Sequence, residues 1–259
     1  MTGSKRRGLI IQERDKHLLR ELSVMRVIDR EQAKVVAGFQ SITRVNRRLL
    51  ALAQAGLLKR FFIGTAGAAK ALYSLSPLGA NLVQVPRRGP RIRKDELVAV
   101  SFSLYHQLGI NEIYCAVKYR PIPLAGARLV RWDSFSGPID SQHSLIPDAY
   151  IEVLGPEKTL TAFLEFDLGH ENLSVWKAKV NKYLRYAVSG DFERSFHHPQ
   201  FRVVVVTDSE RRCEALRRAT AAITDKIFWF STIDSIRRDG FWSPIWFRPR
   251  GDHEPISLL

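Results

Sequence analysis

The stretch PDAYIEVLGPEKTLTAFLEFD, residues 147–167, decides the fold of the second half of the chain. A glycine, a proline and two charged residues at 155–158 separate two segments rich in apolar residues, which predicts a β-hairpin with a four-residue turn. If Leu154 pairs with Thr159 across this turn, apolar side chains from both strands gather on one face. Those side chains are Ala149, Ile151, Val153, Leu160, Ala162 and Leu164. The match between the two apolar faces supports this register.

The same register sets two carboxylates, Asp148 and Glu165, directly opposite each other. Asp167 follows two residues later on the same face, and like charges at this spacing repel unless something neutralises them. A divalent cation would do so, and Mg²⁺ suits carboxylate oxygens that also receive a substrate phosphate. The alternative is a solvated Asp148 at the strand end, with Glu165 paired to a Lys or Arg. Spacing alone leaves both interpretations open.

A helix is predicted over residues 173–188, where apolar residues recur on one face. Lys179 lies within that face, three residues after Trp176 and four before Tyr183. An ammonium group on a packed face needs an anion, and the carboxylates at the end of the hairpin are the available ones. Alternatively, the Lys179 side chain bends so that its charged end reaches solvent at the helix edge.

The segments around the hairpin predict an α/β domain with a central mixed sheet. Helical periodicity, strand-like apolar runs and the N-cap residue Ser209 are the signals used. They predict helices at 95–108 and 209–222, and strands at 127–132, 201–207 and 227–230.

Positive charge is concentrated in the first 94 residues, which carry 20 Lys and Arg against 5 Asp and Glu, whereas residues 95–259 carry 20 against 21. One-sided basic charge is typical of a polyanion-binding surface, and double-stranded DNA is the leading partner. The alternative is a basic surface that serves solubility alone. Residues 86–94, with two prolines, a glycine and five basic residues, predict a linker between domains at 1–85 and 95–259.

The first domain is predicted to contain three helices, two strands and a further helix. Asp29 with Gln32 forms a capping box, and Ser41 begins a third helix that ends at Gly56. That helix is amphipathic, with apolar residues on one face and arginines on another. The predicted strands are 58–63 and 71–75, and Ser76-Pro77 begins the last helix.

This order of elements resembles the winged helix-turn-helix over about residues 10–85, and the stretches AGLLKR at 55–60 and YSLSPLG at 73–79 are similar to that family's passage into its wing. The resemblance implies that the third helix binds DNA, because guanidinium groups bind guanine edges or phosphates and Asn pairs with adenine. The alternative is a winged helix that contacts another protein. The residues expected to contact DNA are Thr43, Arg44, Asn46, Arg47 and Arg48 on the third helix, and Lys59 and Arg60 in the wing.

The second domain is similar to the PD-(D/E)xK nucleases, which share the restriction-endonuclease-like fold. Helix, strand, Pro-Asp strand, Glu-x-Asp strand, helix and strand follow in that family's order. The resemblance makes Asp148 and Glu165 ligands of Mg²⁺ or Mn²⁺, as catalytic residues. Asp167 stands where that family has its lysine, so Lys179 or Asp167 would assist catalysis. Because a DNA-binding domain without activity would show the same pattern, enzymatic activity stays open.

A winged helix followed by Trp132, Pro147-Asp148-Ala149, LEFDLG at 164–169, and Lys179 with Tyr183 resembles the replication-relaxation family of bacterial plasmids and integrative elements. The resemblance implies a sequence-specific or structure-specific DNA-binding protein in replication, relaxation and transfer of a mobile element, or their control. Such a protein would act as a homodimer or as an accessory protein of a larger complex. The alternative is a metal-dependent nickase or endonuclease that uses Asp148 and Glu165.

Several other functions are excluded or disfavoured. No apolar run is long enough for a membrane span, and the start of the chain, with Lys5, Arg6 and Arg7, lacks a signal peptide, so a cytoplasmic protein is expected. The two cysteines, Cys115 and Cys213, predict buried thiols rather than a disulfide or zinc site. The His197-His198 pair is expected in a loop. The aromatic residues Phe241, Trp242, Trp246 and Phe247 are expected to serve packing rather than base stacking.

Overall fold

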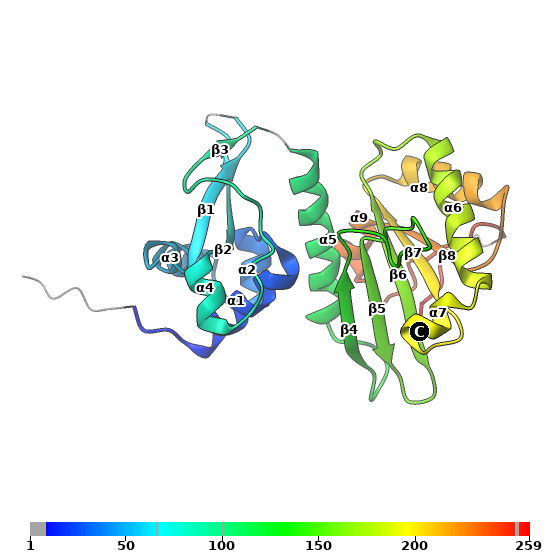
Figure 1. The fold of residues 1–259 in the computed structure, drawn as a ribbon, viewed down its shortest axis with the longest axis horizontal. Helices are drawn as coiled ribbons and strands as arrows, with labels where there is room; N and C mark the ends of the chain where they lie inside the picture. Colours follow the sequence, from blue (N-terminus) through cyan, green and yellow to red (C-terminus); the bar gives the residue numbers. More distant parts are fainter. Residues whose placement is uncertain (1–8, 66, 100, 252–253) are drawn as a thin grey trace, which may run out of the picture. The chain divides into compact units, whose positions relative to one another are not determined.

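The computed structural model describes residues 9–65, 67–99, 101–251 and 254–259. The chain forms two compact units, residues 1–115 and 116–259, which are shown in Figure 1. The basic residues at positions 5–7, on which the expectation about a signal peptide rested, lie outside the described residues. Every helix in the described part of the chain is too short or too polar to cross a bilayer.

The first unit has the order of elements predicted for a winged helix-turn-helix. Asp29 accepts a hydrogen bond from the backbone N–H of Gln32 at 2.8 Å, so the predicted capping box is present. Ser76 likewise caps the helix after the wing, by accepting from the N–H of Gly79 at 2.9 Å. The elements are α1 (Glu13–Met25), α2 (Arg30–Val36), α3 (Ile42–Gln54), β1 (Leu58–Ile63), β2 (Lys70–Leu75) and α4 (Pro77–Val83).

The basic segment 86–94 lies inside the first unit, and the division between the units comes later, within α5 (Phe102–Lys118). Its backbone passes so close to the first unit that a Cβ on Gly89 would lie 2.9 Å from the carbonyl oxygen of Arg26. The residues that follow, β3 (Leu97–Val98), pair in parallel with β1. The segment is therefore a strap on the first unit. The division between the units, within α5, differs from the boundaries expected at 85 and 95.

The helix expected at 95–108 begins instead at Phe102. The reason is the open edge of β1, where the N–H of Phe62 donates to the carbonyl of Glu96 at 2.8 Å, which holds the preceding residues extended. Leu104 and Leu108 of α5 then pack on the wing strands. Asn111 donates to the carbonyl of Val27 at 2.6 Å and so secures the helix to the first unit.

The second unit contains a mixed sheet of order β4-β5-β6-β7-β8, as far as the described residues extend. The hairpin register predicted from the sequence is confirmed, because Leu154 pairs with Thr159 and Ala149 pairs with Leu164. β4, β5 and β6 are antiparallel neighbours, whereas β7 and β8 run parallel to β6. The strands are β4 (Arg128–Ser134), β5 (Ala149–Leu154), β6 (Thr159–Asp167), β7 (Arg202–Thr207) and β8 (Phe228–Thr232).

One face of this sheet is covered by α6 (Leu173–Val188), α7 (Asp191–Phe196) and α8 (Glu210–Ala221). Phe163 of β6 lies at the centre of an aromatic core, with ring centroids 5.0 Å from Phe201 and 5.6 Å from Phe196. A short helix, α9 (Ile233–Asp239), follows β8. Both cysteines are buried thiols, and the aromatic side chains Phe241, Trp242 and Trp246 are buried, as expected for packing.

Candidate functional site

The hairpin brings Asp148 and Glu165 together at one end of the sheet. The N–H of Asp148 donates to the carbonyl of Leu164 at 3.0 Å, and the carboxylate of Asp148 accepts from the N–H of Phe166 at 2.7 Å. The paired register ends at Ala149 with Leu164, and Asp148 lies one residue before it. The charge of Asp148 acts on both Glu165 and Lys179, so the two carboxylates lie near each other. The two side chains share the face of the sheet that α6 covers.

Glu165 is buried, with 3% of its surface exposed, and both of its oxygens accept hydrogen bonds from α6. The ammonium group of Lys179 lies 2.8 Å from one oxygen, and the hydroxyl of Tyr183 donates to the other at 2.5 Å. The positions of Lys179 and Tyr183, four residues apart, place them on one face of the helix. Lys179, the cation predicted on the packed face of α6, therefore lies beside the negative charges of the two carboxylates.

Burial raises the pKa of Glu165 to about 7, against the opposing effect of the Lys179 charge; the charge of Asp148 raises it further. For Lys179, burial lowers the pKa, but the charge of Glu165 and its hydrogen bond outweigh burial and leave that pKa above its ordinary value. Burial and the Glu165 carboxylate both raise the pKa of Tyr183, so its hydroxyl is a neutral donor. The group thus consists of a cation, a neutral donor and a carboxyl whose charge changes near neutral pH.

Asp167 belongs to a different arrangement. Its two oxygens accept from the guanidinium of Arg212 on α8, both at 2.8 Å, and one also accepts from the N–H of Gly169 at 2.6 Å. Arg212 donates in addition to the carbonyl of Glu171 at 2.6 Å. The expectation that Asp167 assists catalysis is therefore not favoured, because a bidentate ion pair already holds its carboxylate.

The outer face of α3 presents most of the side chains predicted to contact DNA. Thr43, Arg44, Asn46 and Arg47 are exposed, whereas Val45, Leu49 and Leu52 are buried. An amphipathic helix with this periodicity turns its polar residues away from the core as one surface. We call the four exposed residues the α3 face.

Two of the predicted DNA contacts are engaged within the protein. The guanidinium of Arg48 holds Asp15, which is 1% exposed, with Nε at 2.8 Å from one oxygen, and it also donates to the carbonyl of Ile10. Arg60 pairs with Asp95 at 2.6 Å. Arg48 precedes the buried Leu49, so it lies at the border of the packed face rather than on the α3 face. Lys59 is half-buried at the start of β1.

The family model for replication-relaxation matches residues 19–197, which include the α3 face and the Asp148, Glu165, Lys179 and Tyr183 group. The chain belongs to the replication-relaxation family. A search of the curated proteins gives no match. Among solved structures, restriction endonuclease FokI is similar at 10% identity and a TM-score of 0.30; the similarity covers 86% of this chain and 43% of the FokI chain. This chain spans less than half of that one, and the likeness supports no conclusion.

Sequence reasoning about this replication-relaxation protein missed Arg212 as the partner of Asp167. A signal was present, because Arg212 follows the N-cap Ser209 by three residues, in the first turn of α8, where the helix dipole disfavours a cation. The strap, residues 86–94, adds a second exposed surface, although this segment was predicted to be a linker. Its basic side chains are all exposed: Arg87, Arg88, Arg91, Arg93 and Lys94.

The metal donors predicted from the sequence of this replication-relaxation protein are the two carboxylates of Asp148 and Glu165. Within the described residues, no group of three or more His, Cys, Asp or Glu side chains is placed to hold a metal ion. Asp148 and Glu165 meet the minimum for Mg²⁺, which keeps several waters and binds through one or two carboxylates. Both oxygens of Glu165 already accept hydrogen bonds, so a cation would have to share that carboxylate with Lys179 and Tyr183.

Proposed function

We propose that this chain binds double-stranded DNA of a bacterial plasmid or other mobile element, and acts in its replication, its relaxation and transfer, or the control of these processes. The observation that carries the proposal is the α3 face. It presents two guanidinium groups, an amide and a hydroxyl on one exposed helix surface, beside a core that fixes the helix rigidly. Family membership supports the mobile-element context.

The chemistry of the α3 face suits a DNA groove. Arg44 and Arg47 lie three residues apart, so successive turns direct both in nearly the same direction. Between them, Asn46 offers the amide pattern that pairs with adenine, and Thr43 can donate to a phosphate oxygen. The exposed strap supplies further phosphate contacts, because its five cations lie on a segment that is fixed to the same unit.

The double substitution Arg44→Ala/Arg47→Ala is expected to weaken duplex binding by about 10- to 100-fold, because it removes two charge-assisted contacts. The slope of log affinity against log salt should become less steep by about 2, one for each lost phosphate contact. Fluorescence anisotropy with a labelled duplex over a salt series measures both quantities. Arg211→Ala/Arg218→Ala removes the same charge from the exposed side of α8 and serves as the control. Equal losses in the two double variants would refute the assignment of α3.

A second function, metal-dependent nicking of DNA, is favoured by the opposed Asp148 and Glu165. Those two carboxylates would hold the cation, which when bound would polarise a phosphodiester oxygen. Lys179, which pairs with Glu165, would hold its ammonium group close to the negative charge that develops on the phosphate. Tyr183 would keep the Glu165 side chain in place as a neutral donor.

If the nicking function is correct, wild-type protein with Mg²⁺ should convert supercoiled plasmid to the open-circular form, and Asp148→Asn should lower that rate by at least about 100-fold. Asp148 is the residue to replace, because changing Glu165 would also leave Lys179 without its partner. Asp225→Asn, on an exposed loop, is the matched control. Calorimetric titration with Mn²⁺ provides a readout that needs no cognate site. The nicking function is excluded if Mn²⁺ binds both variants as it binds the wild type.

A further inference from the structure

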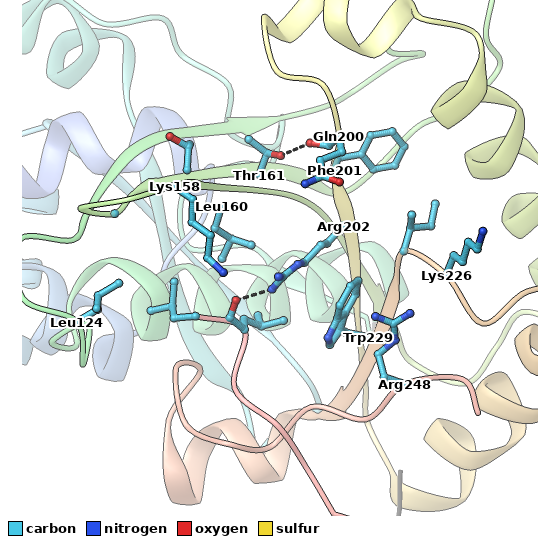
Figure 2. A pocket seen from close by; sticks show the side chains of 15 residues that line it. Leu124, Lys158, Leu160, Thr161, Gln200, Phe201, Arg202, Lys226, Trp229 and Arg248 are labelled. Atoms are coloured by element: carbon cyan, nitrogen blue, oxygen red, sulfur yellow. Dashed lines mark hydrogen bonds between the residues drawn. The ribbon is translucent and has the colours of Figure 1, made fainter. Parts of the chain in front are cut away.

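A separate cavity lies in the second unit, at the end of the sheet away from Asp148 and Glu165. It is lined by the starts of β6 and β7, the region around the start of β8, and the last residues of the chain, and its volume is about 500 Å³ (Figure 2). β7 and β8 run parallel to β6, so the first residues of all three strands lie at the same end of the sheet. Six residues along β6 separate Thr159 from Glu165, which corresponds to roughly 20 Å. The cavity is therefore distinct from the carboxylate pair.

All the charged side chains that line this cavity are cations: Lys158, Arg202, Lys226 and Arg248. In the part of the chain that the structure describes, none of the four forms an ion pair with a carboxylate. Arg202 donates to the carbonyl of Leu258, and Arg248 donates to the carbonyl of Asp225, so their known partners are neutral oxygens. Even with the α-carboxylate of Leu259 on its wall, the cavity therefore has a surplus of positive charge.

Two of the cations, Arg202 and Arg248, lie against the same aromatic ring. The guanidinium carbons of Arg202 and Arg248 lie 4.6 Å and 4.1 Å from the ring centroid of Trp229 (Figure 2). The ring attracts both cations, but it carries no negative charge. Burial, and then the nearby charge of Arg248, lowers the pKa of Arg202 below its ordinary value. The two like charges repel each other, and an anion bound beside them relieves that repulsion.

Two buried hydrogen-bond donors at the cavity lack an acceptor among the described residues. The indole N–H of Trp229, a residue that is 8% exposed, and the Nε–H of Arg248 are buried without a hydrogen-bond partner among the described residues. Both groups can only donate, so each needs an acceptor. A buried donor without an acceptor is destabilising, because it has lost its hydrogen bond to water without replacing it. An oxyanion supplies several acceptor oxygens as well as the negative charge.

The rest of the wall is mainly apolar and includes Leu160, Phe201 and Ile227, with Thr159, Thr161 and Gln200 as neutral polar residues. A cavity of this size, with apolar walls and a few polar groups, is typical of a site for a small organic molecule rather than for a bare ion. We propose that the cavity binds a nucleotide-sized phosphate ester, with its phosphate on Arg202, Arg248, Lys158 and Lys226 and its base or sugar on the apolar wall. Its source is either a free nucleotide or the phosphorylated end of a DNA strand. The proposal does not depend on the functions of α3 or of the carboxylate pair.

Calorimetric titration of the full chain tests this proposal, with deoxyadenosine 5′-monophosphate as the probe and deoxyadenosine as the uncharged comparison. The monophosphate is expected to bind at least tenfold more tightly than the nucleoside. Arg202→Gln should weaken monophosphate binding at least tenfold, whereas Arg211→Gln, on the exposed side of α8, should leave it unchanged. A single-stranded oligonucleotide with and without a 5′-phosphate distinguishes the sources. A preference for the phosphorylated oligonucleotide over the monophosphate identifies a strand end, and the reverse identifies a free nucleotide.

A second variant keeps the test decisive if Arg202→Gln does not fold. Lys158 and Lys226 are exposed, so Lys158→Gln/Lys226→Gln should keep the native fold and still weaken monophosphate binding about tenfold. The proposal is overturned if the wild type binds neither phosphate-bearing probe at millimolar concentration. It is also overturned if the nucleoside binds as tightly as the monophosphate, or if the folded lysine variant binds the monophosphate like the wild type.

Discussion

Lys179→Met is expected to lower the free energy of unfolding by about 3–5 kcal/mol at pH 8, because it removes the cation that faces a fully buried carboxylate. Glu165 would then remain beside Asp148, with the Tyr183 hydroxyl as its remaining donor on α6. Urea denaturation followed by circular dichroism measures the change. Lys177→Met, two residues earlier on the exposed side of α6, removes the same charge and should change the free energy of unfolding by less than about 0.5 kcal/mol.

The effect of Lys179→Met should depend on pH in a defined direction. The folded-state pKa of Glu165 is raised to about 7, from 4.5 in an exposed carboxyl, so the folded protein binds more protons than the unfolded chain between these values. Stability from this group is therefore fully present below pH 4.5 and is lost as the pH rises through 7. Removing Lys179 raises the pKa of Glu165 further, so the loss of stability should be larger at pH 8 than at pH 6.

Lys179→Met/Glu165→Gln is the matched double variant. It removes both charges together, so it should be more stable than Lys179→Met at pH 8 and should show a weaker pH dependence. If Lys179→Met were as stable as Lys177→Met at pH 8, the ion pair seen in the structure would contribute nothing to folding. Lys179 would then be available to a ligand at the carboxylate pair.

Arg48→Ala is expected to lower the free energy of unfolding by about 3 kcal/mol, because Asp15 would remain buried without its cation. The loss should appear in α1 and α3, which the ion pair joins. Hydrogen exchange of their backbone amides, combined with urea denaturation, locates and measures it. The loss of stability should be large because Asp15 also accepts from the N–H of Gln12 at 2.6 Å, which fixes its carboxylate in a buried position.

The neighbouring residue provides the control. Arg47→Ala should leave the free energy of unfolding within about 0.5 kcal/mol of the wild type and should weaken DNA binding, since Arg47 belongs to the exposed α3 face. Arg48→Ala, assayed where it is still folded, should bind DNA more tightly than Arg47→Ala does. The opposite pattern, with a stable Arg48→Ala that has lost DNA affinity, would restore Arg48 to the DNA-contacting set.

Elements with a strong local pattern could be predicted closely. The helix expected at 173–188 has those bounds in the structure, and the hairpin register was correct at every pair from Ala149 to Leu154. Both depend on periodicity and turn chemistry within a short stretch of chain. The start of α5 could not be predicted, because residues 95–98 are extended by pairing with an open strand edge more than thirty residues earlier in the sequence.

In the candidate site, too, some features follow from a local sequence pattern and others depend on distant parts of the chain. Lys179 was expected near a carboxylate because a cation on an apolar helix face is a local anomaly, and Glu165 is its partner. Nothing local marked Asp95 as the partner of Arg60. The local signal at Arg212, a cation in the first turn of α8, did not identify Asp167 as its partner. As a result, Arg60 was predicted to contact DNA and Asp167 to assist catalysis, although both are paired within the protein. The strap was assigned to a linker for a related reason, since its prolines and charges show no helical or strand periodicity.

By itself, the sequence determined the order of the main helices and strands, the packed faces of α3 and α6, and the hairpin register from Ala149 to Leu154. Only the tertiary structure decided which charges are neutralised within the protein and which remain for a ligand. The ion pairs of Arg48, Arg60 and Asp167 join residues 33, 35 and 45 positions apart. Periodicity reports the side on which a residue lies, but a counterion separated by whole elements is set by how those elements pack. The cavity of Arg202 and Arg248 arises in the same way.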